Sequence, residues 1–202
     1  MSALRIILIA MVAFAMVLGG CSGGKKVSRI DTEEMVDLSG NWNDTDSRLV
    51  ADEMISDALS KPWLTNFLRN NGVNPAVIVG AIRNLSDEHI AVGTFVGDIE
   101  RAFVNSGTVR VVADNEERGG VREERQDQQA NASPESMKEF GLELGADYML
   151  MGEINKITDQ EGKEKIAFYQ VDLSLTHIQT NEKVWLGQKK IKKYIARKNY
   201  KS

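Results

Sequence analysis

The sequence predicts a mixed α/β domain (α+β), in which a small mixed sheet carries helices mainly on one face. Two patterns lead to this fold class. Residues 76–113 read as strand, helix and strand, which makes one βαβ unit with a right-handed crossover. Residues 148–195 read as three strands joined by short turns, which makes an antiparallel three-strand meander. We expect one sheet that contains both parts.

Two helical stretches precede the first strand. From Asp46 to Ser60, apolar residues recur at i, i+4 spacing, which is typical of an amphipathic helix. Pro62 begins a second helical piece, which ends at Asn71-Gly72.

The predicted βαβ unit begins after these helices. The continuous apolar run AVIVGAI (76–82) is typical of a strand buried on both faces. Ser-Asp-Glu at 86–88 supplies a cap and acidic residues for the start of a helix, and Gly107 closes that helix. Residues 109–113 then form a second buried strand.

The segment between the βαβ unit and the meander is charged and rich in glutamine. Residues 115–131 contain one large hydrophobic residue, Val121, so they fit either an exposed helix or a mobile loop. We expect a solvated face here, and the alternative is a segment that becomes ordered on contact with a partner. Ser-Pro-Glu at 133–135 predicts a further helix, which Gly145 ends.

The meander begins with a strand over residues 148–157. Its second strand alternates between apolar residues, such as Tyr169 and Leu173, and polar residues, such as Asp172, so one of its faces is expected to be buried. A turn at 180–182 leads into a lysine-rich last strand, and such lysines protect an exposed sheet edge against aggregation.

The N-terminal residues have the pattern of a lipoprotein signal peptide, which we assign to residues 1–20. The unbroken apolar run over 6–18 is too short to span a bilayer, which needs roughly 20 apolar residues. The following Leu18-Gly19-Gly20-Cys21 resembles the bacterial lipobox, whose cysteine is acylated. We therefore expect Cys21 to be the site of lipid attachment, and Ser22 after it favours the outer membrane.

Lipidation divides the mature chain into a tether and a domain. We expect residues 21–45 to form a lipidated flexible tether, with Trp42 docking on the domain, and residues 46–202 to form a single globular α/β domain. A flexible chain of about 24 residues has a typical end-to-end distance of roughly 25–30 Å. The domain is therefore expected to stay close to its membrane.

Composition excludes several classes of function. The formal net charge of −4 does not fit a nucleic-acid-binding protein, and one cysteine cannot form an internal disulfide. His89 and His177 lack a third ligand at metal-site spacing, and neither a GxSxG motif nor a phosphate-binding loop occurs. We therefore expect a protein without a metal or other cofactor, and not an enzyme.

Three segments resemble the penicillin-binding protein activator LpoB family of outer-membrane lipoproteins. They are FGLELGADYMLMGEI (140–154), FYQVDLSLTHIQTNEKVWLGQKKIKK (168–193) and the strand AVIVGAIRN (76–84), and they follow the lipobox in the expected order. The resemblance covers residues 46–198, and related patterns occur in curli-secretion lipoproteins and in domains similar to the amino-terminal part of TolB.

The resemblance implies a small sheet with helices and a function in the cell envelope. It implies a monomeric lipoprotein on the periplasmic face of the outer membrane, which binds a class A penicillin-binding protein and stimulates peptidoglycan synthesis. The alternative is a structural lipoprotein of an envelope secretion complex, as in curli secretion. That alternative needs additional membrane-crossing hairpins, which the sequence does not show.

The C-terminal strand offers candidate partner contacts. Residues 189–201 hold seven lysines or arginines and no acidic residue. Lys189, Lys190, Lys192 and Lys193 are expected to touch an acidic partner, anionic glycan strands or lipid headgroups. The alternative for these four lysines is an edge strand with a solvated end.

Overall fold

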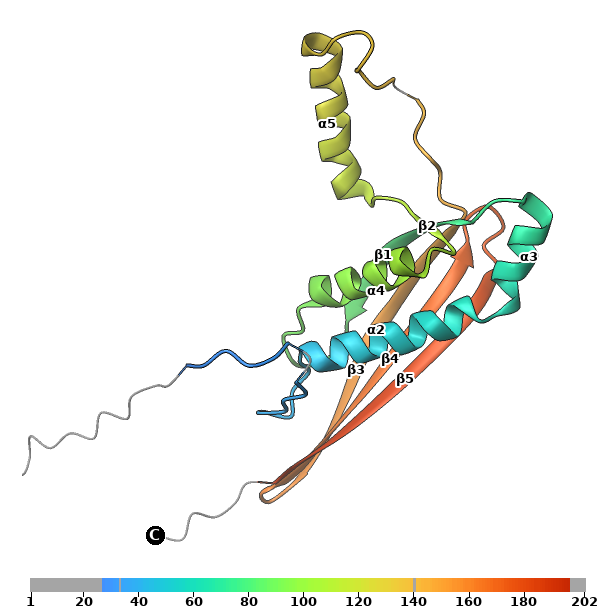
Figure 1. Cartoon of the computed structure of the whole chain (residues 1–202). Coiled ribbons are helices and arrows are strands. Elements are labelled where there is room, and N and C mark those ends of the chain that lie inside the picture. Colours follow the sequence, from blue (N-terminus) through green and yellow to red (C-terminus); the bar gives the residue numbers. More distant parts are fainter. Residues whose placement is uncertain (1–26, 33, 140, 197–202) are drawn as a thin grey trace, which may run out of the picture. The chain divides into compact units, whose positions relative to one another are not determined.

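The computed structural model contains one mixed sheet (Figure 1). The structure describes residues 27–32, 34–139 and 141–196. The strands are β1 (Ala76–Asn84), β2 (Arg110–Val111), β3 (Tyr148–Glu161), β4 (Glu164–His177) and β5 (Lys183–Ala196), and their order in the sheet is β2-β1-β3-β4-β5. The described helices are α2 (Asp44–Leu59), α3 (Pro62–Asn71), α4 (Val92–Ser106) and α5 (Asn115–Asn131).

The chain divides into two units, Met1–Glu34 and Met35–Ser202, and the sheet and the four described helices belong to the second. In the described part of the first unit, the backbone N–H of Glu34 donates to the carbonyl of Asp31 at 3.2 Å. Residues 1–20 and Cys21, to which we assigned a signal peptide and a lipid, lie outside the described residues.

The sheet contains both predicted parts. β1 pairs in parallel with β2 and with β3, and α4 connects β1 to β2, which confirms the βαβ unit. The buried strand predicted over 109–113 is wrong in length and burial, because β2 is a two-residue edge strand that is not buried. β3, β4 and β5 pair antiparallel over nearly their full lengths, which confirms the meander. The mixed α+β fold class is therefore confirmed.

The core lies between the sheet and two of the helices. α2 and α4 contact each other, and they pack on the same side of the sheet, α2 against β5 and α4 against β1 (Figure 1). Fully buried side chains fill this layer: Val50, Ile55, Phe95, Ile99, Phe103, Leu150, Ile154, Val171, Leu173 and Leu175. The opposite face of the sheet is open, since Leu186 and Ile157 on that face are 69% and 65% exposed.

The helix α4 begins later than the sequence predicts. Ser-Asp-Glu at 86–88 lies in a turn, and the N-cap of α4 is Ala91, which makes no side-chain cap. The hydroxyl and backbone N–H of Ser86 both donate to the side-chain oxygen of Asn84, at 2.6 and 3.0 Å. Asn84 in turn donates to the carbonyl of Glu88 at 2.8 Å. Such local hydrogen bonds compete with helix formation, which explains the late start.

The structure also shows that the charged segment is helical. Residues 115–131 form the helix α5, capped by reciprocal hydrogen bonds between Asp114 and Glu117, and none of its residues is buried. The helix predicted after Ser133 is wrong, because residues 133–136 form one turn and irregular chain leads on to β3. Short helices need a buried face to be stable in water, and the exposed residues of this segment provide none.

The last part of the expected tether packs on the domain. Trp42 makes edge-to-face contacts with Phe95 and Tyr169, at ring-centroid distances of 6.0 and 5.7 Å. Its indole N–H donates to the hydroxyl of Ser47 at 2.8 Å. The expected docking of Trp42 is confirmed, so residues near position 42 contribute to the domain that we predicted to begin at residue 46.

Candidate functional site

The four lysines expected on the last strand lie on two faces of the sheet. Successive side chains of a strand point to opposite sides, and β5 follows this alternation. Lys190 and Lys192 are exposed on the open face. Lys189 and Lys193 lie on the face that the helices cover, where both pair with carboxylates. The sequence pattern treats the four lysines as one set, and the structure separates them.

Lys193 is part of an internal ion-pair cluster. Its ammonium group lies 2.6 Å from a carboxylate oxygen of Asp37 and 2.6 Å from one of Asp46, and it donates to the carbonyl of Asn41 at 3.1 Å. Burial alone would lower the pKa of Lys193, but its hydrogen bonds with the two carboxylates outweigh burial and raise the pKa. Through these contacts, Lys193 holds residues 37–46 against β5. Lys189 pairs in a similar way with Glu53 of α2.

A second cluster surrounds Glu88, which belongs to the Ser-Asp-Glu pattern that predicts a helix start. One carboxylate oxygen of Glu88 accepts the backbone N–H of Trp42 at 2.9 Å and the hydroxyl of Tyr169 at 2.8 Å. The other oxygen lies 3.0 Å from the ammonium of Lys156, whose side chain is 3% exposed and which also pairs with Asp87. Burial would raise the pKa of Glu88, but these hydrogen bonds together lower it. Long-range contacts define this role, so no local sequence pattern predicts it.

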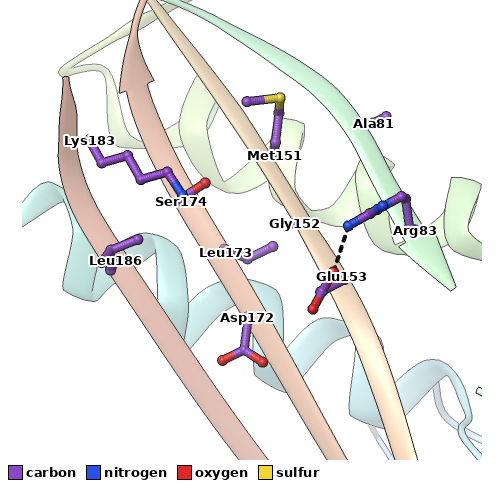
Figure 2. A pocket seen from close by; sticks show the side chains of 10 residues that line it. All are labelled: Ala81, Arg83, Met151, Gly152, Glu153, Asp172, Leu173, Ser174, Lys183 and Leu186. Carbon is purple, nitrogen blue, oxygen red and sulfur yellow. Dashed lines mark hydrogen bonds and ion pairs between the residues drawn. The ribbon is translucent and has the colours of Figure 1, made fainter. Parts of the chain in front are cut away.

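A hollow of about 510 Å³ lies on the open face of the sheet (Figure 2). Ala81, Met151 and Leu186 supply apolar groups from β1, β3 and β5. Arg83 of β1 and Glu153 of β3 form an ion pair of 2.7 Å at one side of the hollow, shown by the dashed line. The hollow thus combines a small apolar area with a charged margin.

A polar band crosses the open face next to this hollow. Asp172 of β4 accepts hydrogen bonds from Gln170 at 2.7 Å and from Gln188 of β5 at 2.8 Å. Beyond the band, Ile157 and Tyr194 are 65% and 63% exposed. Apolar side chains therefore project to solvent on both sides of the polar band, and Lys190 and Lys192 lie on the same face.

This arrangement suits the binding of a macromolecule. Exposed apolar groups bordered by polar and charged groups are typical of protein–protein interfaces. His89 lies in the connection between β1 and α4, and His177 lies at the end of β4. In the described part of the chain, no three His, Cys, Asp or Glu residues form a group that could hold a metal ion. Within the same residues, none of the helices is both long enough and apolar enough to cross a membrane.

The family model described as "Peptidoglycan-synthase activator LpoB" matches residues 46–191. No curated protein matches the chain.

Several solved structures are similar to this chain. The LpoB C-terminal domain from Salmonella enterica is 18% identical, with a TM-score of 0.40, and the match covers 72% of this chain and 98% of that one. The NMR structure of E. coli LpoB is 15% identical, with a TM-score of 0.40, over 86% and 80% of the two chains. Lipoprotein GNA1162 from Neisseria meningitidis is 15% identical, with a TM-score of 0.38, over 62% and 88%.

Proposed function

Because the chain belongs to the LpoB family of peptidoglycan-synthase activators, we propose that it binds a class A penicillin-binding protein and stimulates peptidoglycan synthesis. The activator acts by contact and carries out no reaction of its own. It needs no cofactor.

The observation that carries this proposal is the family match over residues 46–191, which includes the buried core cluster from Val50 to Trp185 and most of the open face. The open face supports a contact mechanism, since Leu186, Ile157 and Tyr194 are all more than half exposed on it. We assign Lys190, Lys192 and Leu186 to the partner interface. Lys189 and Lys193 support that surface from the other side through their ion pairs.

We assign the lipid to Cys21, which places the protein on the periplasmic face of the outer membrane. Only residues 22–34 separate Cys21 from the unit that begins at Met35. Thirteen residues span at most about 45 Å when fully extended. The start of the domain therefore stays within this distance of the membrane anchor, and the synthase must present its binding domain to the lipoprotein there.

We expect the lipoprotein to act as a monomer. The family match does not favour the alternative of a structural role in an envelope secretion complex. A size measurement of the detergent-solubilised chain distinguishes these two functions, because a monomer fits the activator and a ring fits the assembly.

Affinity capture tests the proposed function. Full-length protein with a C-terminal tag is isolated from detergent-solubilised envelope of the source organism, and the bound proteins are identified by mass spectrometry. We expect a class A penicillin-binding protein to be enriched over an untagged control. Enrichment of secretion-pore subunits without any penicillin-binding protein would contradict the proposal.

A matched pair of variants shows whether the open face makes the contact. Leu186→Asp places a charge in the hollow of the open face, whereas Val104→Asp makes the same kind of change at a side chain of α4 that is 59% exposed. We expect Leu186→Asp to reduce capture of the synthase at least about tenfold, because a charge would be buried in an apolar contact. Val104→Asp is expected to capture it at the wild-type level.

A further inference from the structure

The last strand of the sheet has a long outer edge. β5 lies at one end of the strand order, so within the sheet it pairs with β4 alone (Figure 1). In an edge strand, the backbone N–H and C=O groups that do not face the neighbouring strand point away from the sheet. β5 is 14 residues long, whereas short strands are one of the ways in which proteins protect such edges. The edge of β5 is therefore long enough to pair with a strand of another chain.

Two hydrogen bonds show which residues of β5 point outward. The backbone N–H of Ile178 donates to the carbonyl of Asp147 at 2.9 Å, and that of His177 donates to the carbonyl of Glu182 at 2.8 Å. Because backbone groups alternate between the two neighbouring strands, the odd-numbered residues of β4 bond to β5. Their register partners are the odd-numbered residues of 185–195. The residues that direct their backbone groups outward are therefore the even-numbered ones: Leu186, Gln188, Lys190, Lys192 and Tyr194.

The outward backbone groups of these five residues are accessible. Within the described part of the chain, no group forms a hydrogen bond with them. A groove of about 350 Å³ follows the end of the edge and is lined by residues 192–196 and 37–40. Consecutive residues of a strand point their side chains to opposite faces, so they line one groove together only along the backbone edge. Residues 37–40 form the other wall, which the ion pair of Asp37 with Lys193 holds in place.

The charge of the edge limits which strand can pair with it. Lys190 and Lys192 are exposed and form no ion pair with any described residue. An added strand places its side chains about 5 Å from those of its neighbour. Antiparallel pairing with β5 of a second copy would bring the lysines of both copies together, and like charges opposite each other destabilise a sheet. Acidic residues at alternate positions of the added strand would pair with both lysines.

We propose that β5 binds an extended acidic segment of the synthase, which joins the sheet as a further strand. This inference rests on the proposed function and states how the partner is held. Backbone hydrogen bonds to the even-numbered residues provide affinity, and carboxylates beside Lys190 and Lys192 provide selectivity. An apolar side chain of the same segment lies beside Leu186 and reaches the hollow of the open face. The lysines that protect the edge against self-pairing thus select an acidic partner.

Amide hydrogen exchange tests the strand pairing. It is measured residue by residue on the full-length lipoprotein in detergent, alone and in complex with the purified class A penicillin-binding protein of the source organism. In the free chain, we expect slow exchange at the odd-numbered residues of 185–195, which bond to β4, and fast exchange at residues 188, 190 and 192. Binding of the synthase should slow exchange at these three amides at least about tenfold. A partner that contacts only side chains of the open face would leave them nearly unchanged.

A matched pair of variants tests one backbone donor. Gln188→Pro removes an outward N–H, a position at which an edge strand tolerates proline. Gln188→Ala keeps this N–H, and both variants lose the side-chain hydrogen bond to Asp172. We expect Gln188→Pro to weaken binding of the synthase about tenfold more than Gln188→Ala, because one backbone hydrogen bond is lost. Thermal unfolding shows whether both variants fold, and the exchange measurement on the wild type decides the matter where the proline variant does not.

A charge reversal tests the acidic character of the partner segment. Lys190→Glu is expected to weaken binding of the synthase about fivefold, because an attractive pair between neighbouring strands becomes a repulsive one. Lys138→Glu makes the same change at an exposed position outside the sheet and is expected to bind like the wild type.

The outcomes separate this inference from the proposed function. Binding of the synthase without slower exchange at residues 188, 190 and 192 would overturn the strand pairing and leave the activator function intact. Equal binding by folded Gln188→Pro and Gln188→Ala would overturn it as well. Undiminished binding by Lys190→Glu would contradict an acidic segment. No binding of the synthase by the wild type would contradict the proposed function itself.

Discussion

Lys193 connects parts of the chain that are far apart in the sequence. It pairs with Asp37, which lies before the first helix of the domain, and with Asp46, which lies in the first turn of α2. The side chains of Lys193 and Asp46 are each 9% exposed. Loss of one partner from such a buried pair leaves the other charge without compensation.

We expect Lys193→Met to lower the free energy of unfolding by about 3 kcal/mol, because the carboxylate of Asp46 loses its ion pair in a nearly buried position. Lys190→Met is the matched control on the exposed face of the same strand, and its effect should stay within about 0.5 kcal/mol. Urea denaturation measures both variants. Equal stabilities of the two would contradict the assigned role of Lys193.

The lowered pKa of Glu88 predicts that the stability of the folded chain depends on pH. Its pKa in the folded chain lies below the ordinary value of 4.5. The ionised carboxylate therefore contributes stability that is fully present above pH 4.5 and is lost as the pH falls through the lower folded-state pKa. Glu88→Gln should flatten this part of the profile, because the amide does not titrate.

The measurement is the free energy of unfolding between pH 3 and pH 7. We expect the wild type to lose more stability below pH 4.5 than Glu88→Gln does. Glu116→Gln, at an exposed side chain of α5, is the control and should follow the wild type. Parallel profiles for wild type and Glu88→Gln would show that Glu88 makes no such contribution.

At the scale of elements, the strands were predicted best. Two strands were located correctly from the pattern of neighbouring residues alone. The alternation over Tyr169–Thr176 indicates β4, and the apolar run over 76–82 indicates β1. The start of α4 and the helix after Ser133 were wrong, because side-chain hydrogen bonds and missing burial overrode the capping signals. The roles of Glu88 and Lys193 depend on partners more than 40 residues away, which single-sequence patterns do not report.

The packing of β3 against β4 gives a prediction at the same scale. A Cβ atom added at Gly152 of β3 would collide with the carbonyl oxygen of Asp172 and with the side chain of Leu173. We expect Gly152→Ala to lower the free energy of unfolding by about 1–3 kcal/mol, since neither the backbone of β4 nor the buried Leu173 can move freely.

Gly120→Ala in α5 is the opposite case. No atom lies within 4 Å of an added Cβ atom there, and alanine favours the helix over glycine by roughly 1 kcal/mol. Thermal unfolding should therefore show a lower midpoint for Gly152→Ala and an unchanged or higher midpoint for Gly120→Ala. A loss of stability in both variants would mean that α5 is packed more closely than the structure shows.

At the scale of the whole molecule, the two faces of the sheet have different roles: the helices stabilise one face, and the other is the proposed contact surface for a partner. The helices and the ion pairs of Lys189 and Lys193 stabilise one side of the sheet, and Leu186, Lys190 and Lys192 remain available on the other. The packing of Trp42 and Asp37 on the domain also leaves only residues 22–34 between that domain and the proposed lipid at Cys21. The proposed activator therefore presents one sheet face to a synthase within a short reach of its membrane.

The rate of glycan-chain synthesis by the purified class A penicillin-binding protein of the source organism tests the central claim most directly. It is measured alone, with the full-length lipoprotein, and with the Leu186→Asp and Val104→Asp variants. We predict that the wild type and Val104→Asp increase the rate severalfold and that Leu186→Asp loses most of this stimulation. An unchanged rate with the wild-type lipoprotein would contradict the activator function, and equal stimulation by both variants would contradict the open face as its contact surface.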